Sequence, residues 1–256
     1  MTTSVARLLS VAMVTMVMAC GCQCGTNGED TVMDHQQELL ARLTAAPAGS
    51  DVAEIVTAAL AAAKTVPAAQ QDKIFTAAVK MADAANAFKV SLDAPLPVGW
   101  PLPSLAGLVR VKEYPSVRAA WVRDTGGNNN HLMTLLRLIN GKSIPMTAPV
   151  VMAFPQQTAG PAGMAFLYAN TAFGPGGTFG SVIVGDEAQL TVVSIGRWGG
   201  YTARARNKAA TQLNHWLETH PQWRTAGPLR VLCYHSPFHF PWNKYSEIQI
   251  PVAPAK

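Results

Sequence analysis

Charged residues are scarce in this 256-residue chain, since Asp, Glu, Lys and Arg together make up 14% of it, whereas hydrophobic residues make up 49%. This composition is typical of a globular protein and excludes a largely disordered one. The net charge is +5, but the Lys and Arg residues are scattered along the chain. A nucleic-acid-binding surface needs a clustered basic stripe, so we expect no nucleic-acid partner.

Motifs of the common enzyme classes are also missing. The chain has no G-x-S-x-G, no H-E-x-x-H, no P-loop and no G-x-G-x-x-G. The stretch Gly174-Pro175-Gly176-Gly177 is rich in turn residues, but it lacks the strand-to-helix context of a phosphate-binding loop. We therefore expect a protein that is not an enzyme and has no catalytic residues.

Cysteine is limited to four residues, three of which are Cys20, Cys22 and Cys24. Chelating metal sites normally combine C-x-x-C spacing with a second pair of ligands. The remaining cysteine, Cys233, stands alone in the apolar run LRVLCYH. The three N-terminal cysteines therefore favour a flexible tether over a metal site, and Cys233 fits a small buried hydrophobic residue.

The N-terminus carries a short apolar run. One positive charge, Arg7, precedes an uncharged segment that is too short for a membrane span and suits the hydrophobic region of a signal peptide. The ending Val17-Met18-Ala19-Cys20 resembles a bacterial lipobox, in which the cysteine is lipidated. We predict a signal peptide over 1–20, lipidation at Cys20, and a lipoprotein of the cell envelope, periplasmic or on the surface, held at the membrane by its lipid anchor. A secreted protein is the alternative.

A helical pattern follows a predicted tether at 21–33. Asp51 and Glu54 match a capping box, and apolar residues then recur on one face until Pro67, which ends that helix. A short helix is predicted over Gln36–Leu43, and the same apolar spacing returns between Ile74 and Phe88.

The whole segment 34–92 is therefore predicted to be an Ala-rich helical segment, either a helical hairpin or a spacer. Residues 93–105 contain four prolines and are predicted to be an extended linker.

Strand patterns dominate from Leu108 onward. They are LVRVKEY, VRAAWVRD, IPMTAPVVMAF, MAFLYAN, QLTVVSIG, LRVLCYH and YSEIQIPV. Two helices interrupt them, at 129–139 and 202–219, with Thr202 as the N-cap of the second. The order strand–helix–strand–strand therefore occurs twice. This pattern predicts an α+β domain in which a degenerate duplication closes into a curved mixed sheet or barrel with two helices packed on it.

Two prolines stand in the predicted strand IPMTAPVVMAF. Because proline cannot donate to a sheet ladder, we expect Pro145 at the start of the strand and Pro149 at an edge or a bulge.

Several motifs resemble the SOUL haem-binding protein family. LLRLINGKSIPMTAPVVM resembles its signature, with Leu138-Ile139, Asn140-Gly141-Lys142, Ile144, Met146, Thr147, Pro149 and Val150 at the matching positions. TVVSIGRWGGY and VLCYHSPFHFPWNKYSEIQIPV resemble two further family segments. The resemblance covers 106–252 and implies a distorted β-barrel with two helices, built from two similar halves. It also implies binding of haem or another tetrapyrrole as a non-covalent cofactor.

The resemblance implies a site as well. The axial histidine of some members would fall at Glu113, and a carboxylate is a poor substitute for imidazole on haem iron. Other members are thought to hold haem in an apolar groove beside the first helix, with basic residues near the propionates. Leu132, Leu136 and Arg137 are the corresponding cofactor-binding candidates in this chain.

His131, in the first turn of that helix, is either an iron ligand or a solvated residue. Phe238 and Phe240 suit a wall facing a porphyrin, and they suit ordinary packing equally well. His235 and His239 could coordinate a metal, but no carboxylate or cysteine nearby in sequence completes the set.

We expect an exported SOUL-like protein that binds a tetrapyrrole in an apolar groove. The alternatives are an envelope interaction or scaffold protein, and a binder of other small apolar ligands.

Overall fold

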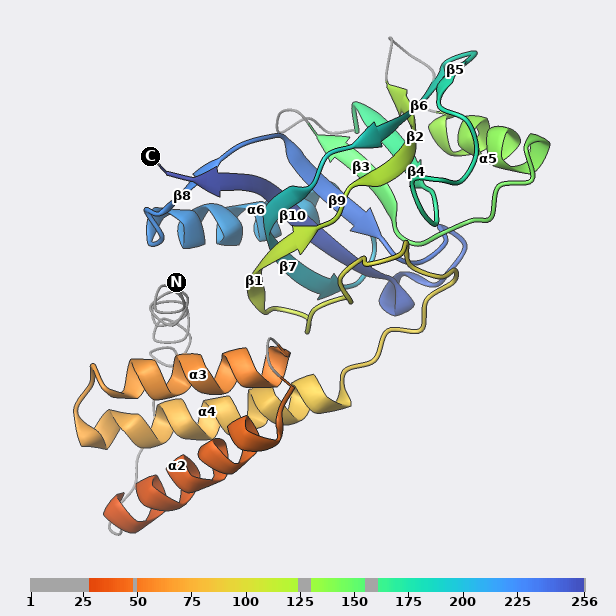
Figure 1. The fold of residues 1–256 in the computed structure, drawn as a ribbon. Coiled ribbons are helices and arrows are strands. Elements are labelled where there is room, and N and C mark those ends of the chain that lie inside the picture. Colours follow the sequence, from red (N-terminus) through yellow and green to blue (C-terminus); the bar gives the residue numbers. More distant parts are fainter. Residues whose placement is uncertain (1–27, 48–49, 124–129, 155–160, 256) are drawn as a thin grey trace. The chain divides into compact units, whose positions relative to one another are not determined.

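The structure is a computed structural model that describes residues 28–47, 50–123, 130–154 and 161–255 (Figure 1). The predicted signal peptide, Cys20 and the first part of the tether lie outside the described residues. The chain divides into two compact units, Met1–Lys89 and Val90–Lys256. Among the described residues, no helix has the length and apolar character needed to cross a membrane.

The described part of the first unit consists of three helices, α2 (Gly28–Ala45), α3 (Asp51–Ala63) and α4 (Ala68–Ala87). Each helix packs against the other two. Their buried contacts are formed mainly by small and aliphatic side chains, including Leu39, Ile55, Val56, Ala59, Ile74, Phe75 and Ala78. The segment is therefore a three-helix arrangement. Its first helix, α2, is longer than the short helix predicted from the sequence and packs against both α3 and α4.

The start of α3 differs from the prediction in one detail. The N-cap is Ser50, whose Oγ accepts a hydrogen bond from the backbone N–H of Ala53 at 3.2 Å. Asp51, the predicted cap, is instead the first helical residue, where its negative charge is favourable near the helix N-terminus. Two adjacent residues of the sequence are good caps, and pattern alone does not choose between them.

A ten-stranded antiparallel sheet and two helices form the second unit, so the α+β class is confirmed. The strands are β1 (Val109–Tyr114), β2 (Val117–Arg123), β3 (Val150–Phe154), β4 (Gly163–Leu167), β5 (Gly177–Phe179), β6 (Val182–Glu187), β7 (Leu190–Trp198), β8 (Trp223–Thr225), β9 (Leu229–Cys233) and β10 (Tyr245–Pro254). The helices are α5 (His131–Gly141) and α6 (Ala203–Glu218), and a single 3₁₀ turn, η1 (Pro241–Asn243), precedes β10. Thr202 is the N-cap of α6, as predicted, and accepts from the backbone N–H of Ala205 at 3.3 Å.

The two halves of the sheet meet at the β3–β9 pair, where Val151 lies opposite Leu232. The strand order is β1-β7-β10-β9-β3-β4-β2-β6-β5, and β8 pairs with β10. The run β7-β10-β9 in one half therefore mirrors β2-β4-β3 in the other. Each half has the order strand–helix–strand–strand, apart from the short β8 between α6 and β9.

The sheet is not closed into a barrel, in contrast to the expectation from the sequence. Its end strands, β1 and β5, do not pair with each other. The hairpin of β5 and β6, which the strand patterns did not predict, extends the end of the sheet away from β1.

Both helices cover the same face of the sheet (Figure 1). Leu135 and Ile139 of α5 belong to a core cluster with residues of β2, β4 and β6, and Leu213 and Trp216 of α6 belong to one with residues of β7, β9 and β10. Val150 of β3 packs against both clusters. Since side chains alternate along a strand, Val151 and Ala153 of β3 point to the opposite face.

Strand β3 begins at Val150, later than the sequence suggests. Pro145 and Pro149 both precede it, and the Ala148–Pro149 peptide bond is cis. The ladder with β4 and β9 therefore starts only after the second proline, where every residue has an N–H to donate. The segment before the strand is held by the hydroxyl of Thr147, which donates to the carbonyl oxygen of Leu167 at 2.6 Å.

The proline-rich stretch predicted to be a linker belongs to the second unit. Trp100 and Ser104 within it are buried. The indole of Trp100 packs against the ring of Tyr114, with 4.5 Å between the ring centroids.

Candidate functional site

A groove lies between α5 and the loop that joins β9 to β10. It has a volume of about 390 Å³, and most of its lining is apolar. Leu132, Leu136 and Ile139 line it from α5, at a spacing that places them on one side of the helix. Val150 and Met152 line it from β3, as alternate residues on the face that the helices cover.

Three methionines, Met146, Met152 and Met164, contribute to this lining. Methionine is unbranched and polarizable, so it adapts to irregular apolar surfaces and is common in sites that accept ligands of varied shape. Small-molecule sites typically have volumes of about 300–1,000 Å³ and a few polar groups in an apolar wall. The groove fits this description.

His235 is a polar residue of the lining, but both of its ring nitrogens are engaged. Its Nδ1 accepts a hydrogen bond from the backbone N–H of Tyr245 at 2.9 Å, and its Nε2 lies 2.8 Å from the carbonyl oxygen of Ser91. Since a carbonyl oxygen can only accept, the Nε2 carries the proton. His235 therefore fixes the loop and leaves no lone pair for a ligand.

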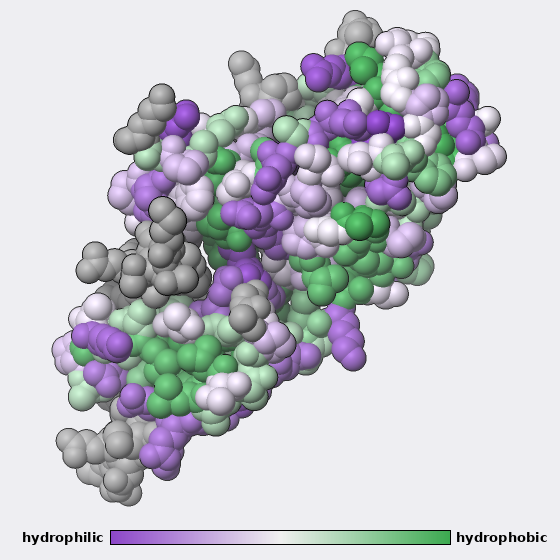
Figure 2. Space-filling view, viewed as in Figure 1, coloured by the Kyte–Doolittle hydropathy of each residue, from purple (hydrophilic) through white to green (hydrophobic). Residues whose placement is uncertain are grey.

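Asp93, two residues after Ser91, also holds this loop. One carboxylate oxygen accepts the backbone N–H of Ser236 at 2.7 Å, and the other lies 3.1 Å from Nε2 of His239. The loop is therefore anchored at its start, whereas the aromatic side chains that follow are exposed: Phe238 is 93%, Phe240 is 64% and Trp242 is 67% exposed. Figure 2 shows that apolar side chains gather in patches on the visible face of the second unit, between polar ones.

The structure brings together three of the predicted cofactor-binding residues. Leu132, Leu136 and Phe238 all line the groove. The other three, His131, Arg137 and Phe240, are not part of its lining: His131 is buried, Arg137 is exposed on α5, and Phe240 stacks on Trp242 at 4.9 Å between ring centroids.

Histidine-ligated haem does not fit the described residues of the groove. Among the lining residues that the structure describes, His235 alone carries an imidazole, and neither of its ring nitrogens is free. Glu113 is exposed on β1 and is not part of the lining. The groove therefore fits a ligand that is held by burial of apolar surface.

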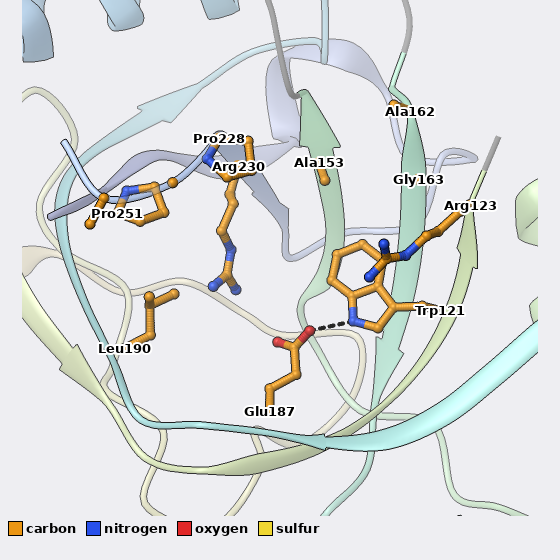
Figure 3. Close-up of a pocket in the computed structure, with 12 residues that line it drawn as sticks. Trp121, Arg123, Ala153, Ala162, Gly163, Glu187, Leu190, Pro228, Arg230 and Pro251 are labelled. Atoms are coloured by element: carbon orange, nitrogen blue, oxygen red, sulfur yellow. Dashed lines mark hydrogen bonds between the residues drawn. The ribbon is translucent and has the colours of Figure 1, made fainter. Parts of the chain in front are cut away.

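A second pocket lies on the opposite face of the sheet and has a volume of about 430 Å³. Arg230 of β9 and Glu187 of β6 both point into it (Figure 3). The indole N–H of Trp121 donates to Oε1 of Glu187. Small and apolar residues form most of the remaining wall, among them Ala153, Gly163, Leu190, Pro228 and Pro251.

A buried carboxylate, that of Glu247, lies on the same face. Its Oε1 lies 2.6 Å from Nζ of Lys112 and accepts the backbone N–H of Ser104 at 2.8 Å. Its Oε2 accepts the hydroxyls of Tyr234 at 3.1 Å and Tyr114 at 3.3 Å. Burial, together with the charge of Glu247, raises the pKa of both tyrosines well above the usual range. Both carboxylate oxygens of Glu247 therefore have partners within the protein.

The strand patterns passed over Arg230 and Glu247. Arg230 is the one charged residue of LRVLC, and Glu247 is the one charged residue of YSEIQIPV, and both strands are largely buried. A lone charge within a mainly apolar strand pattern is the signal that could have identified them, because a buried charge needs a partner or a ligand.

No family model matches the chain, and no curated protein matches it. Among solved structures, the EcmrR C-terminal domain is 18% identical over 58% of this chain and 98% of its own, with a TM-score of 0.45. A structure described as a hydrolase, from Listeria innocua, is 10% identical over 59% of this chain and 94% of its own, with a TM-score of 0.46.

EcmrR in its DNA complex is 17% identical, with a TM-score of 0.46, and the match covers 58% of this chain and 58% of EcmrR. Likeness at this level gives no ligand, activity or partner for this chain.

Proposed function

We propose that the second unit binds a small apolar molecule in the groove between α5 and the β9–β10 loop. The observation that carries this proposal is the apolar lining of a cavity of about 390 Å³, with Leu132, Leu136 and Phe238 in its wall. Burial of apolar ligand surface supplies about 25 cal/mol per Å², less the cost of association. The protein is then a binding protein and not an enzyme.

The sequence resemblance suggests a tetrapyrrole as the ligand class. The hydrogen bonds of His235 restrict how a tetrapyrrole could be held. Because the groove offers iron no free imidazole among its described residues, we expect burial of the macrocycle to supply most of the affinity. Haem and its metal-free counterpart, protoporphyrin IX, are then equivalent ligands.

Titration of the full chain with both compounds tests the proposal. We expect saturable binding at one ligand per chain, by the Soret band for haem and by fluorescence for protoporphyrin IX, with dissociation constants within about threefold. Much tighter binding of haem alone would show that an iron ligand, such as a methionine of the lining, is used. Linear, non-saturating uptake of both compounds would exclude tetrapyrroles.

Lipidation of Cys20 would place this unit at a membrane surface, where apolar compounds accumulate. Stable anchoring needs more than one acyl chain, which a multiply acylated cysteine provides. This part of the proposal rests on the lipobox-like sequence alone.

A further inference from the structure

The pocket opposite the helices contains a buried cation that has no hydrogen-bond partner in the part of the chain that the structure describes. Arg230 is only 8% exposed. Its Nε atom has no hydrogen-bond partner among the described residues, and its side chain makes no other hydrogen bond there. Figure 3 shows its guanidinium directed into the pocket. Since the guanidinium of arginine stays charged in proteins, burying it unpaired is unfavourable.

Glu187 does not satisfy this cation. Its carboxylate points into the same pocket (Figure 3), where it accepts the indole N–H of Trp121. Glu187 makes no hydrogen bond with Arg230. Burial lowers the pKa of Arg230, and the nearby charge of Glu187 offsets only part of this effect. The space between the two side chains belongs to a cavity of about 430 Å³.

We propose that this pocket is a second ligand site, in which Arg230 binds the carboxylate of a small organic anion and Trp121 contacts the apolar body of the same molecule. A carboxylate matches the guanidinium fork with two parallel hydrogen bonds. The apolar wall formed by Leu190, Pro228 and Pro251 suits the rest of the ligand.

The charges in the pocket select for a monoanion. Arg123, at the exposed end of β2, adds a second positive charge to the lining, and Glu187 adds one negative charge. A single carboxylate neutralises the resulting excess. A phosphate group carries more negative charge and would be repelled by Glu187, so inorganic phosphate is expected not to compete.

Isothermal titration calorimetry of the full chain with 2-naphthoate tests the proposal, with the neutral 2-naphthamide as the matched compound. We expect saturable binding of one naphthoate and at least tenfold weaker binding of the amide. The Arg230→Met variant, which keeps the length of the side chain without its charge, should bind naphthoate at least tenfold more weakly.

Arg224→Met is the matched control, because Arg224 is exposed on the adjacent β8 and does not line the pocket. It should bind naphthoate within about twofold of the wild type. Leu136→Gln, which alters the groove on the other face, should do the same, so failure of this proposal is distinct from failure of the proposed function. No binding by the wild type, equal binding of the amide, or equal binding by a folded Arg230→Met chain would overturn the proposal.

If Arg230→Met fails to fold, Glu187→Gln decides. Glutamine keeps an oxygen for the indole of Trp121 and removes the competing charge. Naphthoate should then bind more tightly than to the wild type, and unchanged or weaker binding would contradict the proposal.

Discussion

Nζ of Lys112 lies 2.6 Å from Oε1 of Glu247 inside the second unit, and the two side chains are 5% and 0% exposed. This ion pair joins β1 to β10, the strands that flank β7 on either side. Because Glu247 also accepts hydrogen bonds from two tyrosines and a backbone N–H, its charge is compensated from several directions.

Removing one partner of this pair should be costly. Lys112→Met leaves the carboxylate of Glu247 buried without its counter-charge, and we expect a loss of about 3–5 kcal/mol in the free energy of unfolding. Urea unfolding followed by tryptophan fluorescence reports on this unit, since all six tryptophans lie in it. Arg118→Gln, which breaks the exposed pair with Asp186, is the control. A similar loss in both variants would contradict the role of burial.

Gly196 of β7 should tolerate no side chain. A Cβ at this position would lie 1.9 Å from the hydroxyl oxygen of Tyr245 and 2.9 Å from the carbonyl oxygen of Ser104. Gly196→Ala therefore forces backbone or ring movement, and we expect a destabilisation of about 1–3 kcal/mol. Gly185→Ala on β6, where nothing lies within 4 Å of the added Cβ, should change stability by less than about 0.5 kcal/mol. Equal effects in thermal unfolding would refute the close approach.

Stability of the second unit should fall at alkaline pH. Burial raises the pKa of the Cys233 thiol far above its ordinary value of 9.0, so the folded chain keeps a proton that the unfolded chain releases. The contribution is complete below pH 9 and is lost as the pH rises above it, with a slope of at most about 1.4 kcal/mol per pH unit for this group. In Cys233→Ala the decline should begin nearer 10.0, the ordinary value of the buried Tyr114 and Tyr234. Identical pH profiles of the two chains would exclude the thiol as the cause.

Much of the fold is predictable from the sequence because its elements have strong local signals. The order strand–helix–strand–strand is legible twice, and Thr202 caps α6 as its residue type suggests. In the β5–β6 hairpin, β5 was missed because it has three residues, too few for an alternating pattern. β6 was missed because half of its residues, Gly185, Asp186 and Glu187, are of types that are uncommon in strands. With that hairpin unseen, the sequence could not show that the sheet ends at β5 instead of closing.

Side-chain burial was harder to predict than element type. His220, just after α6, is a polar residue, yet it is 3% exposed and stacks on Trp216 with 3.7 Å between ring centroids. Leu132 and Leu136 of α5 were candidates for the groove through the family resemblance, and both line it. Arg230 could not be assigned to the pocket on the opposite face, because that pocket is formed by strands that are distant in sequence.

The lipid anchor is testable apart from the fold. Metabolic labelling of a bacterial expression host with an alkyne fatty acid should modify the wild-type chain and Cys22→Ala, and should fail for Cys20→Ala. Labelling that persists in Cys20→Ala would exclude the lipobox interpretation.

The most direct measurement of the central claim is the affinity of the groove for protoporphyrin IX in two variants of α5. Leu136→Gln places a polar group in the lining, whereas Met133→Gln makes a comparable change on the same helix at an exposed position outside it. We predict about tenfold weaker binding for Leu136→Gln and an unchanged dissociation constant for Met133→Gln. Equal affinities in all three chains would contradict the assignment of the groove as the binding site.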